Sequence, residues 1–132
     1  MIGETLRILV VDDNRDSATS WATLLNLLGH NTCAAYDGLE AVKASAKFHP
    51  EIILLEIGLP KMNGYEACRM IRQQSTGENI VIVALTGWGQ EEDRRKSRSA
   101  GFDRHLVKPV DFQSLLKLLA DVQSARAPKP LR

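Results

Sequence analysis

The chain has 132 residues, of which 44% are hydrophobic and 25% are charged. These values are typical of one globular domain with its own core, and they exclude disordered and fibrous proteins. The formal net charge of +1 argues against a protein whose whole surface binds nucleic acid or membranes. No apolar run reaches membrane-spanning length, and the amino end lacks a signal-peptide pattern. We therefore expect a cytoplasmic protein with no membrane partner.

Short runs of apolar and β-branched residues predict five strands, at residues 6–11, 31–36, 52–55, 79–85 and 102–107. A helix is predicted after each strand, at residues 14–28, 39–49, 64–74, 90–99 and 112–122. The third and fourth strands are apolar throughout, which is typical of strands buried on both faces of a parallel sheet. The alternation predicts an α/β fold with helices on both faces of that sheet.

The predicted domain covers residues 1–124. Residues 125–132 contain Pro128 and Pro130 without any periodicity, and they are interpreted as a tail or the start of a linker. Within the second helix, Leu39, Val42 and Ala46 are expected to face inward because they share one helical face.

Two cysteines and two histidines are interpreted as structural residues. Cys33 and Cys68 lack CxxC spacing, so we expect buried thiols in a reducing compartment and neither a disulfide nor a metal site. His30 and His49 are expected to be ordinary loop residues.

Polar residues follow four of the predicted strands, at the point where each strand ends. Asp12 and Asp13 follow the first strand, and Glu56 ends the third. Thr86 ends the fourth strand and Lys108 follows the fifth. The carboxyl ends of parallel strands meet at one edge of the sheet, where ligands bind. Three carboxylates there suit Mg²⁺, and an ammonium with a hydroxyl suits the oxygens of a transferring phosphoryl group.

Each of these residues also has an ordinary structural interpretation. Asp12 or Asp13 can cap the helix that follows, and Thr86 can cap the next one. Glu56 and Lys108 can be solvated residues at strand ends. We favour one shared chemical site because all five residues gather at the same edge of the sheet.

These residues resemble the receiver domains of two-component response regulators. The resemblance covers residues 7–123 and rests on four motifs, at residues 10–14, 58–64, 84–87 and 108–109. It implies a flavodoxin-like (βα)5 fold, a doubly wound parallel sheet of strand order 2-1-3-4-5. It also implies Mg²⁺ bound by Asp12 and Asp13 beside Glu56, with the backbone carbonyl of Gly58 as a further ligand.

The resemblance implies a signalling module of a phosphorelay and not an enzyme. In the family, a phosphoryl group passes from the histidine of a kinase or phosphotransfer protein to an aspartate after the third strand. Lys108 and Thr86 are then expected to bind the phosphoryl oxygens, and Thr86 and His105 to move together as a switch. The surface formed by residues 90–99, 102–107 and 112–122 is expected to bind a downstream protein or output domain. The Lys108–Pro109 peptide is usually cis in the family.

The phosphoacceptor position holds Glu56 where the family has aspartate. One extra methylene moves the carboxylate toward Thr86 and Lys108, and a displacement of ~1 Å can cost on the order of 100-fold in an in-line transfer. We therefore expect phosphorylation of Glu56 to be severely slowed or absent. The retention of Asp12, Asp13, Thr86 and Lys108 favours a recent or deliberate substitution in an otherwise competent receiver.

Two consequences for the signalling state stay open at this point. The charge of Glu56 can partly mimic a phosphoryl group, which brings ~1.5 to 2 negative charges. Alternatively, Glu56 pairs with Lys108 and holds the inactive form. A separate alternative function is a phosphorylation-independent pseudo-receiver that acts as a protein-interaction module. Both a monomer and a dimer fit the sequence.

The sequence fits two other functions less well, a cofactor-binding protein and a hydrolase. A flavodoxin-like cofactor protein needs a phosphate-binding loop after the first strand, where Asp12 and Asp13 would repel a phosphate. A hydrolase with an aspartyl nucleophile would need an Asp-x-Asp pattern, whereas this pair is adjacent. Trp88 is interpreted as a partner anchor, a lid on the site or a packing residue. A basic run is expected to be a solvated helix end and not a nucleic-acid site; it comprises Arg94, Arg95, Lys96 and Arg98.

Overall fold

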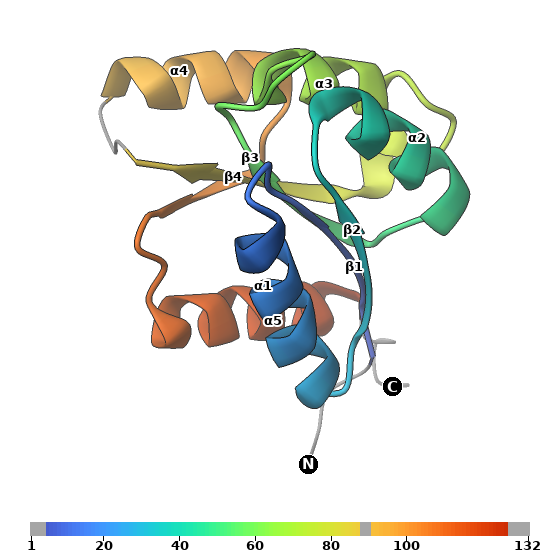
Figure 1. The fold of residues 1–132 in the computed structure, drawn as a ribbon, viewed down its shortest axis with the longest axis vertical. Coiled ribbons are helices and arrows are strands. Elements are labelled where there is room, and N and C mark those ends of the chain that lie inside the picture. Colours follow the sequence, from blue (N-terminus) through green and yellow to red (C-terminus); the bar gives the residue numbers. More distant parts are fainter. Residues whose placement is uncertain (1–4, 88–90, 127–132) are drawn as a thin grey trace, which may run out of the picture.

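The computed structural model describes residues 5–87 and 91–126, without the side chains of 91–94 and 126 (Figure 1). Its strands are β1 (Arg7–Val11), β2 (Asn31–Ala35), β3 (Ile52–Glu56), β4 (Val81–Thr86) and β5 (Arg104–Val107). Its α-helices are α1 (Arg15–Leu27), α2 (Gly38–Phe48), α3 (Gly64–Arg72), α4 (Glu91–Ala100) and α5 (Phe112–Arg126). A single 3₁₀ turn, η1 (Gly77–Asn79), precedes β4.

The strands form one parallel sheet in the order β2-β1-β3-β4-β5. This order confirms the predicted flavodoxin-like topology. Helices α1 and α5 cover one face of the sheet, and α2, α3 and α4 cover the other (Figure 1). The chain therefore reverses its winding direction after β1, and the carboxyl ends of β1 and β3 lie side by side.

Each face of the sheet has its own hydrophobic core. Leu9, Ile53 and Ile82 point toward α2, α3 and α4, whereas the alternate residues Ile8 and Leu54 point toward α1 and α5. This alternation explains why the central strands are apolar throughout, because both of their faces are buried.

Two strands begin two residues later than the sequence predicts, and β1 begins one residue later. Residues 79–80 were assigned to the fourth strand, but residues 77–79 form η1 and β4 begins at Val81. Residues 102–103 were assigned to the fifth strand, but the backbone N–H of Phe102 bonds to Ser97 and closes the end of α4. β5 therefore begins at Arg104.

The inward face predicted for α2 is wrong. Leu39 and Ala46 are exposed, and Val42 is only partly buried. The helix instead buries the small residues Ala41 and Ser45, because its axis lies close to the sheet and to α3. Small side chains allow this close approach, and a pattern search for large apolar residues misses them.

Other structural predictions have mixed outcomes. Cys68 is buried and Cys33 is half-buried, and both thiols are free. His30, predicted to be an ordinary loop residue, is buried. Helix α5 continues to Arg126, while residues 127–132 of the predicted tail lie outside the described residues, so the domain boundary stays a prediction. Among the described helices, none is long and apolar enough to cross a membrane.

Candidate functional site

The end of β1 presents two carboxylates at the edge of the sheet. The backbone N–H of Asp12 bonds to Ala35 of β2, which extends the β1 ladder by one residue. The side chain of Asp12 is buried and accepts a 2.9 Å hydrogen bond from the backbone N–H of Asn14. Asn14 in turn caps α1 through the backbone N–H of Ser17. Asp13 lies between these two fixed residues and is exposed.

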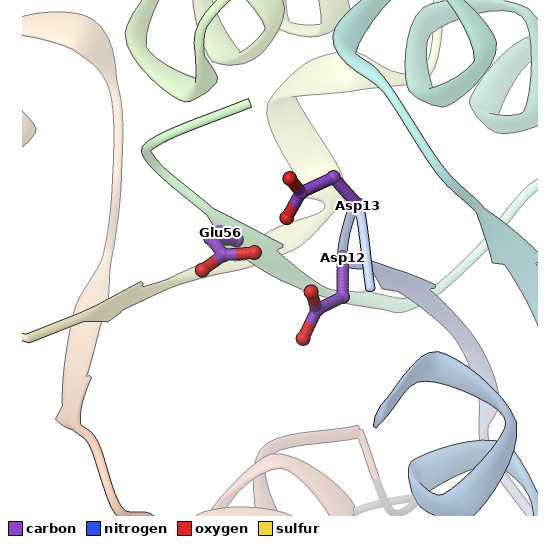
Figure 2. Close-up of side chains that lie close together, drawn as sticks. All are labelled: Asp12, Asp13 and Glu56. Atoms are coloured by element: carbon purple, nitrogen blue, oxygen red, sulfur yellow. The ribbon is translucent and has the colours of Figure 1, made fainter. Parts of the chain in front are cut away.

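The last residue of β3 brings a third carboxylate to the same place. Glu56 points toward Asp12 and Asp13 across a small open space (Figure 2). One carboxylate oxygen from each residue lies within 4.8 Å of the others. We call Asp12, Asp13 and Glu56 the acidic cluster. The structure thus brings together the three acidic residues that the sequence placed at two neighbouring strand ends.

Lys108 provides a positive charge beside this cluster. Its Nζ donates a 2.5 Å hydrogen bond to Oε1 of Glu56 and lies 3.8 Å from Oδ2 of Asp12. The backbone N–H of Lys108 donates to the carbonyl of Thr86, which fixes the residue at the end of β5. The Lys108–Pro109 peptide is cis, as the resemblance implied.

The Glu56 carboxylate is partly buried and lies near a second carboxylate, that of Asp12. Burial raises the pKa of Glu56 to about 6, the Lys108 hydrogen bond opposes this rise, and Asp12 adds to it. Oε2 of Glu56 is buried and accepts no hydrogen bond from the described residues. Lys108 contacts Glu56 and Asp12, and Asp13 adds a third carboxylate nearby, so a divalent cation would complete the neutralisation. The donor set of hard oxygens fits Mg²⁺ or a similar ion.

The other predicted site residues lie around the cluster. Gly58 is exposed in the loop after Glu56, and a Cβ built there meets no neighbouring atom within 4 Å. A side chain would therefore fit at that position without a clash. Thr86 is buried and lines a hollow of about 330 Å³ together with Glu56 and Tyr65. His105 is half-buried on β5, directly across from Ala84. The predicted role of Trp88 falls outside the described residues.

Comparison with known proteins agrees with this geometry. The response regulator receiver domain family matches residues 8–120. The chain belongs to this family. Receiver domains are signalling modules of two-component systems.

The receiver matches curated relatives over most of its own length. Protein PilG of Pseudomonas aeruginosa is 32% identical over 84% of the chain and 82% of PilG. Response regulator MprA of Mycobacterium ulcerans is 36% identical over 85% of the chain. The matched region spans only 47% of MprA, so that relative is about twice as long as the shared receiver.

Solved receiver structures superpose closely on this one. Chemotaxis protein CheY4 of Vibrio cholerae has a TM-score of 0.85 and 28% identity, covering 90% of this chain and 99% of CheY4. The receiver domain of the sensor kinase PA1611 of Pseudomonas aeruginosa, solved with magnesium in its active-site cleft, has a TM-score of 0.82 and 31% identity, with coverages of 92% and 99%. The receiver of Saccharomyces cerevisiae Ssk1, solved with the phosphotransfer protein Ypd1, has a TM-score of 0.89 and 25% identity, with coverages of 97% and 95%.

The sequence analysis missed the contact between Asp37 and Lys61, which lies near this site. Asp37 caps α2 and lies 3.5 Å from Lys61 of the loop after β3. The available signal was a capping residue, Asp37, with Glu40 three positions later. The pairing with Lys61 has no sequence signal, because the two residues are far apart in the chain.

Proposed function

We propose that this chain is a two-component receiver in which Glu56 occupies the phosphoacceptor position. In this function, phosphorylation is impaired, and the Glu56 carboxylate partly mimics the charge of the phosphorylated state. The observation that supports the proposal is the 2.5 Å hydrogen bond between Lys108 and Glu56 at the end of β3.

Partial mimicry requires the Lys108–Glu56 hydrogen bond, and so does the alternative in which this pair holds the inactive form. Glu56 reaches Lys108 directly, and Lys108 is the residue proposed to bind a phosphoryl oxygen. Lys108 is therefore already engaged by a negative charge in the absence of phosphate. Glutamate supplies about one charge against ~1.5 to 2 for a phosphoryl group, so the mimicry is incomplete.

The same contact explains why transfer to Glu56 is expected to be slow. Lys108 holds one carboxylate oxygen, Oε1, and the extra methylene displaces the whole carboxylate from an aspartate's position. In-line transfer is sensitive to such displacements. Phosphoryl transfer depends on positioning and charge neutralisation, and the remaining parts of the site, Asp12, Thr86 and Lys108, are all present.

Mg²⁺ is the proposed cofactor. Asp12, Asp13 and Glu56 would hold it, with the Gly58 backbone carbonyl as a further ligand. The bound cation would supply charge neutralisation for phosphoryl oxygens. The unbalanced charge of the acidic cluster and the magnesium in the related PA1611 receiver support this assignment.

The proposed partners are a histidine kinase or a phosphotransfer protein, and a downstream protein or output domain. The related Ssk1 receiver in complex with Ypd1 supports the first partner. For the second, the α4-β5-α5 surface exposes two large apolar side chains, Val107 and Phe112. Partly exposed apolar residues of this kind suit a protein contact. Lys96 and Arg98 are exposed on α4, and we assign them to solvent and not to nucleic acid.

A mass measurement tests the proposal. The parent chain and its Glu56→Asp variant are incubated with Mg²⁺ and a small-molecule phosphodonor, and their intact masses are recorded over time. We expect only the aspartate form to gain a phosphoryl group. Efficient phosphorylation of the parent at Glu56 would contradict impaired transfer. If neither form reacts, the domain is a phosphorylation-independent pseudo-receiver.

A further inference from the structure

The loop that follows Glu56 lies directly on the first turn of α2. This β3–α3 loop, residues 57–63, contains Gly58 and leads into α3. A Cβ built on Gly38, the first residue of α2, would lie 1.9 Å from the backbone oxygen of Met62. No side chain fits in that space. The loop backbone and the helix backbone are therefore in contact through a residue that must be glycine for steric reasons.

An ion pair joins the same two segments. Asp37 accepts a 2.8 Å hydrogen bond from the backbone N–H of Glu40 with one oxygen, and its other oxygen lies 3.5 Å from Nζ of Lys61. The side chain of Asp37 is only 7% exposed, whereas that of Lys61 is 65% exposed. Lys61 has a φ of 66°, a left-handed conformation that is unfavourable for a residue with a side chain.

The other end of the loop is also fixed by backbone contacts. The N–H of Gly64 donates a 2.8 Å hydrogen bond to the carbonyl of Ile57, and a Cβ on Gly64 would lie 2.6 Å from the carbonyl oxygen of Glu56. A shift of the loop at Met62 would therefore be transmitted to the backbone beside Glu56 and Gly58. These are the residues to which we assigned metal binding.

We propose that Asp37 and Gly38 are positioning residues for the metal site, acting through the β3–α3 loop. This inference rests on the proposed function, because it concerns the affinity of the acidic cluster for Mg²⁺. Asp37 and Gly38 do not touch the cation. They hold the loop against α2, so that the Gly58 carbonyl faces the cluster before the cation binds.

Two glycine variants separate positioning from general damage to the fold. Gly38→Ala forces the loop away from α2. Gly77→Ala is the matched control, because its Cβ would lie 2.1 Å from the backbone oxygen of Ile71, at the start of η1 and ahead of β4. The dissociation constant (Kd) for Mg²⁺ is measured by calorimetry on the full chain, and thermal unfolding is recorded without metal. We expect Gly38→Ala to raise the Kd about 10-fold. Gly77→Ala should leave the Kd unchanged while lowering the unfolding temperature.

Two charge variants test the inference if Gly38→Ala does not fold. Asp37→Asn keeps an oxygen for capping α2 but loses the ion pair. Lys61→Met removes the ammonium from the same pair. Positioning predicts that both variants weaken Mg²⁺ binding, by about 2- to 5-fold for a partly exposed pair. If the two side chains act on the cation only through long-range electrostatics, the two variants should change Mg²⁺ affinity in opposite directions. Asp37→Asn should weaken binding, whereas Lys61→Met removes a positive charge and should tighten it.

The outcomes are distinguishable. Weaker binding by both Lys61→Met and Gly38→Ala, with normal binding by Gly77→Ala, supports the inference. Tighter binding by Lys61→Met, or equal Kd values for the two glycine variants, overturns it and leaves the proposed metal site intact. Absence of Mg²⁺ binding by the parent chain overturns the metal assignment and the inference together.

Discussion

Lys108 of the loop after β5 donates a 2.5 Å hydrogen bond to Glu56 at the end of β3. The two residues are 52 positions apart in the sequence, and each comes from the end of a different strand. Oδ2 of Asp12 lies 3.8 Å from the same ammonium. The protonation of Glu56 and the charge balance of the acidic cluster therefore depend on the Lys108 ammonium.

Replacing Glu56 with glutamine should stabilise the metal-free protein above pH 6. The pKa of Glu56 is raised from 4.5 to about 6, chiefly by burial. A raised pKa in the folded state means that the stabilisation is full below the unfolded value and is lost as the pH rises through about 6. Because one pKa unit equals about 1.4 kcal/mol, the variant should gain up to about 2 kcal/mol over the parent at pH 7.5.

Urea unfolding in the presence of a chelator, from pH 4 to pH 8, measures this difference. The gap between Glu56→Gln and the parent should close toward pH 4. Glu78→Gln removes an exposed carboxylate from η1 and serves as the control. Parallel pH profiles for the parent and Glu56→Gln would contradict the assignment.

Replacing Lys108 with methionine should make the protein depend on divalent cations for stability. The variant leaves Glu56 and Asp12 without their ammonium, and we expect a loss of about 1 to 2 kcal/mol without metal. The expected loss is smaller than that for breaking a fully buried ion pair, because the Lys108 side chain is 34% exposed and solvent partly screens its charge. Mg²⁺ should restore more stability to Lys108→Met than it adds to the parent, as thermal unfolding with and without Mg²⁺ would show. Lys117→Met, at an exposed position on α5, should respond to Mg²⁺ as the parent does.

His30 should destabilise the protein as the pH falls below its unfolded pKa of about 6.5. Its Nδ1 accepts a 3.0 Å hydrogen bond from the backbone N–H of Leu6 and must be unprotonated to do so. Burial lowers the pKa of His30, and Glu51 partly opposes this shift. A lowered pKa in the folded state means that the unfolded chain binds the proton first, so stability falls with decreasing pH.

The His30 effect has the opposite sign to that of Glu56, so it is best measured in the Glu56→Gln background. Urea unfolding between pH 7.5 and pH 5.5 should show a smaller loss of stability for His30→Gln than for the unchanged histidine. An equal loss in both forms would show that His30 is not the group responsible.

Arg72 should contribute more to stability than any exposed ion pair in the described part of the chain. Its guanidinium donates to the carbonyls of Gly77, Ile80 and Gly101 and to the carboxylate of Asp103. These bonds join α3 to η1 and to the loop between α4 and β5. Arg72→Met should lower the free energy of unfolding by about 3 kcal/mol, because several buried carbonyls lose their donor.

Arg104→Met is the control for Arg72. Arg104 pairs with Asp121 at 3.0 Å, but both side chains are about half exposed. Such pairs contribute about 0 to 1 kcal/mol. Similar urea midpoints for the two arginine variants would contradict the role assigned to Arg72.

The sequence predicted the sheet well because its signals are local. The apolar runs of β3 and β4 mark strands buried on both faces, and polar residues at the strand ends mark the edge predicted to hold the site. Asp12, Asp13, Glu56 and Lys108 were placed at that edge, and the structure brings them together. The strand order came from the resemblance to receiver domains and not from the periodicity.

The features that the sequence did not predict depend on backbone contacts between distant segments. Arg72 bonds mainly to carbonyls, which every residue has, so no residue type in the sequence marks its partners. Gly38 and Met62 lie close together through main-chain atoms. The residue types at positions 37 and 38 do not indicate that the loop after β3 packs against them. The buried face of α2 was misplaced for a related reason, because close packing selected small side chains over large apolar ones.

We propose that the Glu56 carboxylate partly mimics the charge of a phosphorylated aspartate at the same position. The most direct test compares amide chemical shifts of Thr86 and His105 in three samples with Mg²⁺: the parent, Glu56→Asp, and Glu56→Asp kept phosphorylated by excess phosphodonor. We predict that the parent's signals lie between those of the two aspartate samples. Signals that coincide with those of unphosphorylated Glu56→Asp would contradict the claim and show that Glu56 holds the inactive form.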